Sequence, residues 1–246
     1  MAASTTFAQH EIRRTFRQPI TWLALAIFSA VNAIYFMLLL VRYLENQAQL
    51  GAAGVSVEIV TRYFGGCSMM LILVIPIVTM ATISGDRQSG LLRFYFSTPL
   101  SSAGYVLGKT AGVAAVLFAV IILLSLLPLT LLWGAPIDTG ILATNCLGVM
   151  LFSAFHIALG IFATAINSSA LGAALISLSL SLSLWFAEGA ERLGDEHSAI
   201  GLLSTLTRMR GFYQGLLVSY DVLFFVTGTV VLLGLAVAAI NFERQL

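Results

Sequence analysis

Six runs of apolar residues dominate the sequence, and each is long enough to cross a hydrocarbon core of about 30 Å as a helix. The chain is 59% hydrophobic and only 9% charged, and a soluble domain of this size needs more charge on its surface. We therefore predict an all-α integral membrane protein with a single domain over residues 1–246. The predicted spans lie near residues 20–41, 63–84, 110–133, 140–166, 170–187 and 221–242.

A further stretch, residues 198–219, is fairly apolar but holds Arg208 and Arg210 at its middle. Each arginine would cost roughly 2.5–3.5 kcal/mol at the centre of a membrane helix. We predict an outer-surface helix here and not a seventh span. The other outer segments are too short for a folded domain, so any outer or periplasmic partner is expected to bind chiefly at residues 188–220.

The distribution of charge predicts the orientation. Six spans place both termini on one side, where seven basic residues stand against three acidic ones, while the other side holds five basic and eight acidic residues. The basic excess predicts that both termini are cytoplasmic, in a bacterial cell (inner) membrane. Residues 1–18 have no apolar core, so we expect no cleavable signal peptide. The net charge of +1 gives no indication of nucleic-acid binding.

Residues 4–18 have the pattern of a basic amphipathic helix. His10, Arg13, Arg14 and Arg17 share one face at helical spacing, and Ala8, Ile12 and Phe16 share another. We expect this helix to lie in the headgroup region with its arginines toward anionic lipid or solvent. A solvated helix is the alternative. Pro19 should end it.

Residues 84–110 form the longest polar interruption between apolar runs. The turn at Ser84–Asp86 and the break before Pro99 predict a helix of roughly three turns over residues 86–97. Residues 103–110 nearly match a phosphate-binding loop, but Ala103 replaces its first glycine and a span follows it. We expect no ATP binding on this chain and a Lys109 side chain that extends to the inner interface.

Few polar residues lie within the predicted spans. Asn32 and His156 fall near the middle of the first and fourth spans, and such groups are possible members of a transport pathway. The alternative is a neutral histidine bonded to a neighbouring helix. No second ionisable group lies at that depth, which argues against a proton relay, and the sequence predicts no catalytic residue, metal site or cofactor site.

Other residues in the spans have structural interpretations. Ser169, Ala173, Ser177 and Ser181 form a stripe of small residues suited to close helix packing, with a polar pathway as the alternative. Pro76 and Pro128 should bend the second and third spans. Cys67 and Cys146 are expected to be small buried side chains, although their predicted depths do not exclude a disulfide.

Two motifs carry a resemblance to a known family. The stretch from Gly85 to Ser101, which contains Ser97-Thr-Pro-Leu-Ser, is followed by Tyr105-Val-Leu-Gly-Lys109. This combination resembles the segment after the second span in permeases of the type-2 ABC transporter family. Residues 210–225 and 242–246 are similar to the last outer segment, final span and short tail of the branch with gliding-motility and nitrous-oxide-reductase-maturation permeases. That family usually has Glu at the position of Asp86 and Thr at that of Leu91.

The resemblance implies roles for particular residues. It implies that residues 86–97 are a coupling helix that contacts an ABC ATP-binding subunit, that residues 4–18 are an elbow helix, and that Asn167 and Ser168 form a second cytosolic contact. The implied subunit-contact residues are Asp86, Arg87, Gly90, Leu91, Arg93 and Phe94. ATP and Mg would bind the partner subunit, and a second permease chain would complete a homodimer or heterodimer.

The expected function is therefore that of a permease subunit, not an enzyme, that couples ATP hydrolysis on another chain to export or conformational work. One alternative is mechanotransmission to an outer protein without solute transport. Another is a membrane assembly factor or intramembrane enzyme without an ATPase. The exposed aromatic residues Phe94 and Phe96 beside charged groups favour a protein contact, with simple attachment to lipid as the other interpretation.

Overall fold

The computed structural model describes residues 2–46, 54–134, 137–193 and 203–245, and every regular element within them is helical. Six helical segments in this part of the chain are long and apolar enough to cross a membrane, which confirms the predicted fold class. They are Pro19–Glu45, Ser56–Gln88, Ser102–Trp133, Thr139–Ile166, Ala170–Ala187 and Ser219–Gln245.

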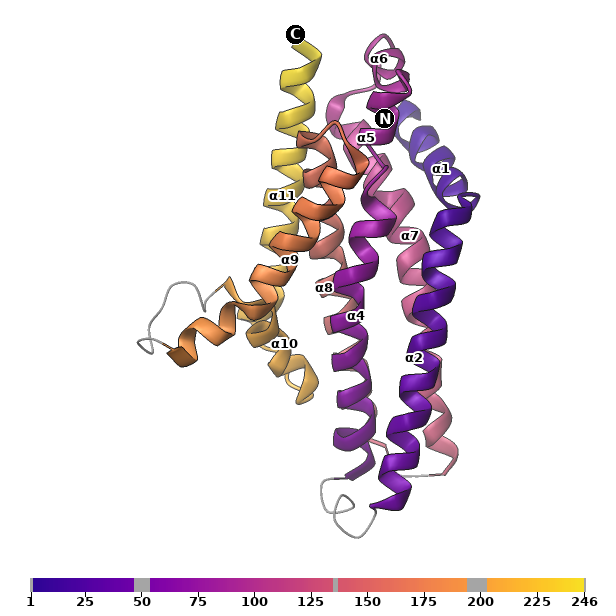
Figure 1. The fold of residues 1–246 in the computed structure, drawn as a ribbon, viewed down its shortest axis with the longest axis vertical. Coiled ribbons are helices and arrows are strands. Elements are labelled where there is room, and N and C mark those ends of the chain that lie inside the picture. The colour runs from indigo at the N-terminus through magenta and orange to yellow at the C-terminus, as the bar shows by residue number, and fades with distance from the viewer. Residues whose placement is uncertain (1, 47–53, 135–136, 194–202, 246) are drawn as a thin grey trace.

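The helices follow one another with short connections (Figure 1). In chain order they are α1 (Ala2–Phe16), α2 (Pro19–Glu45), a π-helical turn η2 (Ser56–Thr61) that continues into α4 (Arg62–Thr79), α5 (Ser84–Gln88), α6 (Leu91–Phe96), α7 (Ser102–Leu129) with a 3-10 turn η3 (Thr130–Trp133), α8 (Thr139–Ile166), α9 (Ala170–Leu193), α10 (Thr205–Tyr213) and α11 (Ser219–Gln245).

Helix α8 lies at the centre of the bundle. It packs against α4, α7, α9, α10 and α11, while α2 packs on α4 and α7. Helix α1 leaves the line of α2 at a sharp corner and lies along the first part of α7. Both termini, α5 and α6 gather at one end of the bundle (Figure 1), which we call the terminal end. The opposite end holds the last turns of α2 and α7.

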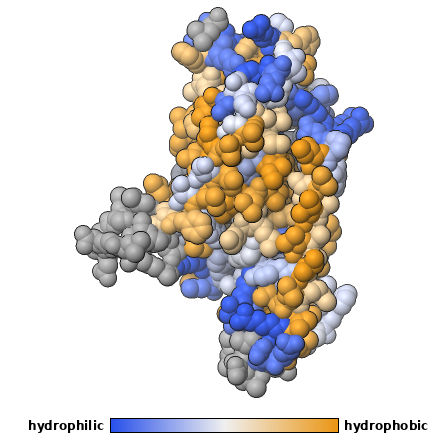
Figure 2. Space-filling model, viewed as in Figure 1, coloured by the Kyte–Doolittle hydropathy of each residue, from blue (hydrophilic) through white to orange (hydrophobic). Residues whose placement is uncertain are grey.

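Hydropathy divides the surface along the same axis. Apolar side chains cover the middle of the face shown in Figure 2, and hydrophilic side chains collect near both ends. Burial follows the packing. Of the most apolar 18-residue stretch of α8, 67% is buried inside the bundle, whereas only 17% of the corresponding stretch of α11 is buried. The outer faces of α2 and α11 therefore contact lipid or another protein chain in the membrane.

Capping residues explain where the helices begin. The Ser101 hydroxyl accepts a hydrogen bond from the Gly104 amide at 3.1 Å, so α7 begins at Ser102 and is longer than the predicted span from residue 110. Pro19 occupies the first turn of α2, where its missing N–H is tolerated. Pro128 lies near the carboxyl end of α7, and Pro76 lies near the carboxyl end of α4 but well inside the span Ser56–Gln88.

Helix α10 differs from the expected outer-surface helix. It is only nine residues long and is not a seventh span, but it packs against α8 and α9 with Met209 and Phe212 fully buried. Gly148 of α8 permits this contact, because an added Cβ would lie 2.7 Å from the Phe212 Cβ. Arg208 forms an ion pair with Asp221 at 3.4 Å, and its guanidinium lies 4.3 Å from the centre of the Tyr220 ring.

Candidate functional site

The predicted coupling segment lies at the terminal end of the bundle, and it is two helices instead of one. Gly90 separates α5 from α6 with a φ of 76°, a left-handed conformation that a glycine adopts without strain. The prediction of one continuous helix over residues 86–97 is therefore wrong. The break turns α6 outward and lets α5 face the interior.

The Asp86 side chain points into the protein. It is fully buried, its Oδ2 lies 2.6 Å from the Lys109 Nζ, and the Tyr105 hydroxyl donates to the same oxygen at 2.9 Å. Arg14 of α1 pairs with the other carboxylate oxygen at 2.9 Å. Asp86 therefore cannot offer its side chain to a partner subunit, which corrects the predicted contact.

A second carboxylate completes this group. Glu11 of α1 is 3% exposed and accepts a hydrogen bond from Lys109 at 3.0 Å. We call Glu11, Arg14, Asp86, Tyr105 and Lys109 the buried ionic cluster. Its two carboxylates and two cations balance in charge, and they join α1, α5 and α7. Lys109 is 2% exposed, so the prediction that it extends to the interface is wrong. Arg14 pairs with Asp86 but keeps a 32% exposed side chain, so it is only partly turned inward.

Aromatic rings enclose the cluster. Tyr95 of α6 lies 5.3 Å from the Phe7 ring and 5.5 Å from the Tyr105 ring, measured between centroids. Lys109 lies 5.5 Å from the Tyr105 centroid. Burial raises the pKa of Tyr95, and the negative charges of Glu11 and Asp86 raise it further, so this phenol stays neutral. The side chains of Glu11, Asp86 and Lys109 are almost fully buried, so the ion pairs of Lys109 are shielded from water and strengthened.

Arg87 connects α5 to two other parts of the chain. Its Nε donates to Glu243 of α11 at 2.8 Å. Its Nη1 donates to the Asn167 carbonyl at 2.6 Å and its Nη2 to the Ala165 carbonyl at 2.8 Å, both at the carboxyl end of α8. These carbonyls have no partner within the helix, so a cation is favourable there. Arg87 is thus a largely internal link and not a free surface residue.

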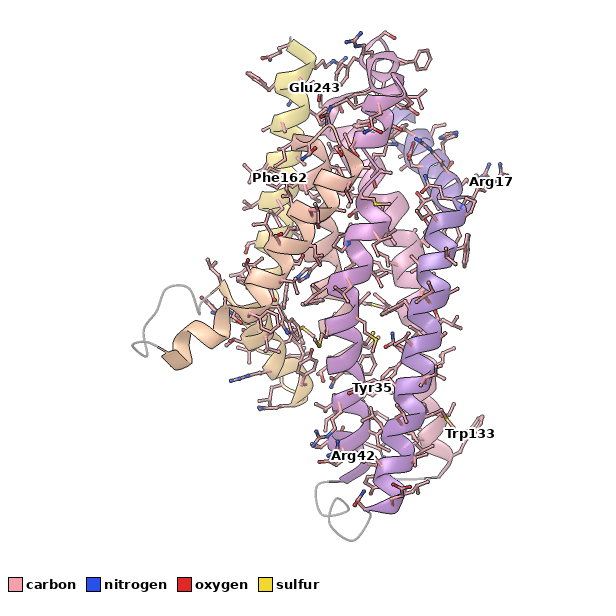
Figure 3. All side chains as sticks on the ribbon, in the orientation of Figure 1. Arg17, Tyr35, Arg42, Trp133, Phe162 and Glu243 are labelled. Carbon is pink, nitrogen blue, oxygen red and sulfur yellow. The ribbon has the colours of Figure 1, made fainter. Side chains whose placement is uncertain are left out.

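Arg244, which follows Glu243 in α11, contacts the carboxyl end of the α5–α6 segment. Arg244 donates to the carbonyl of Phe96, the last residue of α6, at 3.1 Å and to the Leu100 carbonyl beyond it at 2.9 Å. We call Glu243 and Arg244 the α11 anchor; Figure 3 labels Glu243 on the last turns of α11. The sequence did not predict these contacts of Glu243 and Arg244, nor those of Glu11 and Tyr105 in the buried ionic cluster.

Three of the predicted contact residues form an exposed face on α6. Leu91 is 39% exposed, Phe94 is 64% exposed and Arg93 is exposed, whereas Leu92 between them is buried. We call Leu91, Arg93 and Phe94 the α6 face. Beside it, a groove of about 810 Å³ runs between the α5–α6 pair and the α11 anchor, lined by Arg87, Gln88, Gly90, Leu92, Arg93, Phe96, Glu243 and Arg244.

The α8–α9 turn lies next to α5. Gln88 donates to the Ser168 carbonyl at 2.9 Å, and Asn167 accepts from the Ser169 amide at 2.8 Å before α9 begins. Asn167 and Ser168, predicted as a second contact, are therefore adjacent to α5. Arg13 of α1 and Arg17, which directly follows α1, are exposed at the nearby corner with α2. Whether a partner binds any of these residues stays a prediction.

The two proposed pathway residues are not brought together. Asn32 is fully buried and donates to the Phe28 carbonyl of its own helix at 2.8 Å. His156 is also fully buried, and its Nδ1 lies 2.8 Å from the Phe152 carbonyl. This contact is within its own helix, whereas the expected bond was to a neighbouring helix. Asn32 lies on α2 and His156 on α8, and α4 packs against both helices.

Other predicted features can also be placed. Cys67 and Cys146 are free thiols. Ser177 and Ser181 are buried against neighbouring helices, in agreement with a packing stripe, while Ser169 is exposed. Residues 103–110 are helical, so they form no phosphate-binding loop. The predicted outer surface over 188–220 includes residues 194–202, which lie outside the described residues.

The comparison with family models adds one finding to this geometry. The model described as "ABC-2 family transporter protein" matches residues 5–189. The matched region includes the whole buried ionic cluster, the α6 face and the α8–α9 turn, and it ends before α10 and α11. The comparison with curated proteins gives no match.

Proposed function

Because the chain belongs to the ABC-2 family of transporter proteins, we propose that this multi-pass membrane permease couples ATP hydrolysis by a separate ATP-binding subunit to export or conformational work. ATP and Mg²⁺ would bind that subunit. A second permease chain, identical or related, would pair with this one, since one chain has few helices to enclose a pathway. The terminal end would face the cytoplasm of a bacterial cell, as the basic excess favours.

The α6 face carries this proposal. A leucine, an arginine and a largely exposed phenylalanine stand together on α6, at the terminal end of the bundle (Figure 1). Aromatic and arginine side chains dominate the binding energy of protein interfaces. The Phe94 ring lies 6.2 Å from the Tyr95 ring but is 64% exposed, so most of its surface is open to a partner. This combination favours docking of a soluble partner over attachment to lipid.

The attachments of α5 and α6 suggest how movement would pass into the membrane. The buried ionic cluster ties α5 to α1 and α7, and Arg87 ties it to α8 and α11. A push on the α6 face would therefore move several helices together. ATP can drive this change only if the ATP-binding subunit prefers one arrangement of these helices over the other.

Purification with an epitope-tagged chain tests whether the α6 face binds the ATP-binding subunit. The chain is isolated in mild detergent from its native membrane, and the co-purifying ATP-binding chain and its ATP hydrolysis are measured. Phe94→Ala with Arg93→Glu should reduce recovery of that chain at least tenfold, since interface anchors of this kind contribute about 2 kcal/mol or more. Loss of the partner with retained thermal stability supports the proposal.

Trp133→Ala is the matched control, because Trp133 is 92% exposed at the opposite end of the bundle (Figure 3). It should leave recovery of the ATP-binding chain unchanged. Recovery of no ATP-binding chain with the wild type would contradict the proposal and favour an assembly factor. ATP-dependent accumulation of solute in vesicles would separate export from mechanotransmission, which stays the alternative.

A further inference from the structure

A positively charged cavity lies at the corner between α1 and α2. Its volume is about 510 Å³, and it is lined by His10, Arg13, Arg14, Arg17, Gln18 and Pro19. The corner is short, because α1 ends at Phe16 and α2 begins at Pro19. The Trp22 indole N–H donates to the Phe16 carbonyl across this corner, which fixes the two helices relative to one another.

Two cations of the cavity are uncompensated. Arg14 pairs with Asp86, and the Glu11 carboxylate is buried against Lys109 on the inner side of α1. Arg13 and Arg17 are exposed, and no ion pair joins either to another described residue. The cavity therefore carries a net positive charge that the buried ionic cluster does not cancel.

Apolar surface continues from the cavity along α2. Ile20, Leu23 and Ile27 are 52%, 63% and 58% exposed, and Trp22 between them is 47% exposed. Figure 3 labels Arg17 at the corner, and Figure 2 shows hydrophilic side chains at that height above apolar ones. Tryptophan is typical of the level at which headgroups meet acyl chains. The cavity thus lies where a lipid phosphate would lie.

We propose that this corner binds one anionic glycerophospholipid. Arg13 and Arg17 would hold the phosphate through charge-assisted hydrogen bonds, for which the planar guanidinium is well suited. An acyl chain would cover Ile20, Leu23 and Ile27. A free phosphate would use only the first set of contacts, so the adjoining apolar strip favours a lipid. The site needs no ATP-binding subunit and is independent of the proposed function.

Native mass spectrometry of the full chain in detergent tests the site, with phosphatidylglycerol, phosphatidylcholine and inorganic phosphate as separate probes. The wild type should retain phosphatidylglycerol in preference to phosphatidylcholine, and millimolar phosphate should not displace it. Each of Arg13→Gln and Arg17→Gln should weaken retention roughly fivefold, and the double variant roughly 30-fold.

Arg42→Gln is the matched control, because Arg42 is exposed at the far end of α2 (Figure 3) and loses one charge outside the cavity. It should retain phosphatidylglycerol as the wild type does. Arg13→Lys with Arg17→Lys keeps the charge without the guanidinium geometry and should bind between the wild type and the double glutamine variant, which gives a readout even where the glutamine variants fold poorly. Equal loss with Arg42→Gln, equal retention of phosphatidylcholine, or displacement by phosphate would each overturn the proposal.

Discussion

Lys109 is buried, although its position in the sequence predicts an exposed side chain. In the sequence it stands at the foot of a span, where a lysine normally extends to the interface. In the structure it is 2% exposed between Glu11 and Asp86. A buried lysine of this kind is favourable only while both carboxylates remain in place, because an unpaired charge in the interior is costly.

Replacement of this lysine should therefore destabilise the protein strongly. Lys109→Met leaves two buried carboxylates with Arg14 as their remaining cation, and we expect the free energy of unfolding to fall by about 3–5 kcal/mol. Denaturant unfolding in detergent micelles measures this change. Adding Asp86→Asn to Lys109→Met should recover part of the loss.

Arg93→Met is the control for that experiment, because Arg93 is exposed and outside the buried ionic cluster. Its expected effect is within about 0.5 kcal/mol, as for most surface substitutions. Equal stability of Lys109→Met and the wild type would show that the carboxylates are hydrated and that the cluster does not hold α1, α5 and α7 together.

At the scale of helices, the packing of α1 on α7 depends on glycines of α7. An added Cβ at Gly112 would lie 2.9 Å from the Thr15 hydroxyl and 3.1 Å from the Glu11 carbonyl oxygen. An added Cβ at Gly108 would lie 2.5 Å from the Phe7 ring. These close approaches bring the backbone of α1 near enough for Glu11 to reach Lys109.

A large side chain at this contact should separate the two helices. In Gly112→Leu, we expect α1 to move away from α7 and its amide hydrogens to exchange at least tenfold faster, equivalent to about 1.4 kcal/mol of opening free energy. Hydrogen exchange with mass spectrometry measures this locally. Gly234→Leu on α11 makes the same change where no atom lies within 4 Å of the added Cβ, and it should leave α1 unaffected. Unchanged exchange in Gly112→Leu would contradict the packing.

The sequence predicted the helices better than their contacts. Apolar runs are local signals, so the six spans and the all-α class followed from them and are confirmed. The buried ionic cluster joins residues separated by up to 98 positions, and no local pattern distinguishes a paired charge from a solvated one. Glu11 is the single acidic residue within a basic helix, but this pattern does not identify its partner. Gly90 was the sequence signal for the break between α5 and α6, which the prediction of one continuous helix missed.

At the scale of the whole molecule, charge and hydropathy favour one orientation. The terminal end holds the exposed arginines Arg13, Arg17 and Arg93, and an excess of basic residues is typical of the cytoplasmic side. The opposite end holds Trp133 and the last turn of α2 (Figure 3). The orientation itself stays a prediction.

Cysteine labelling in vesicles of known sidedness measures the orientation. With Cys67 and Cys146 replaced by alanine, Phe94→Cys should react with a membrane-impermeant maleimide only from the cytoplasmic side, and Trp133→Cys only from the other side. Both positions are exposed, at 64% and 92%. The reverse pattern would place the termini outside and remove the basis for docking a cytoplasmic ATPase.

The α11 anchor also has a consequence for the order in which the protein is built. Glu243 bonds to Arg87 across 156 residues of sequence, and Arg244 reaches Leu100 across 144. During synthesis the α5–α6 segment emerges with the second span, but both of its α11 contacts are made only after the last span has left the ribosome. The α6 face therefore acquires this support only after α11 has been synthesised, later than its contacts with α1 and α7 can form.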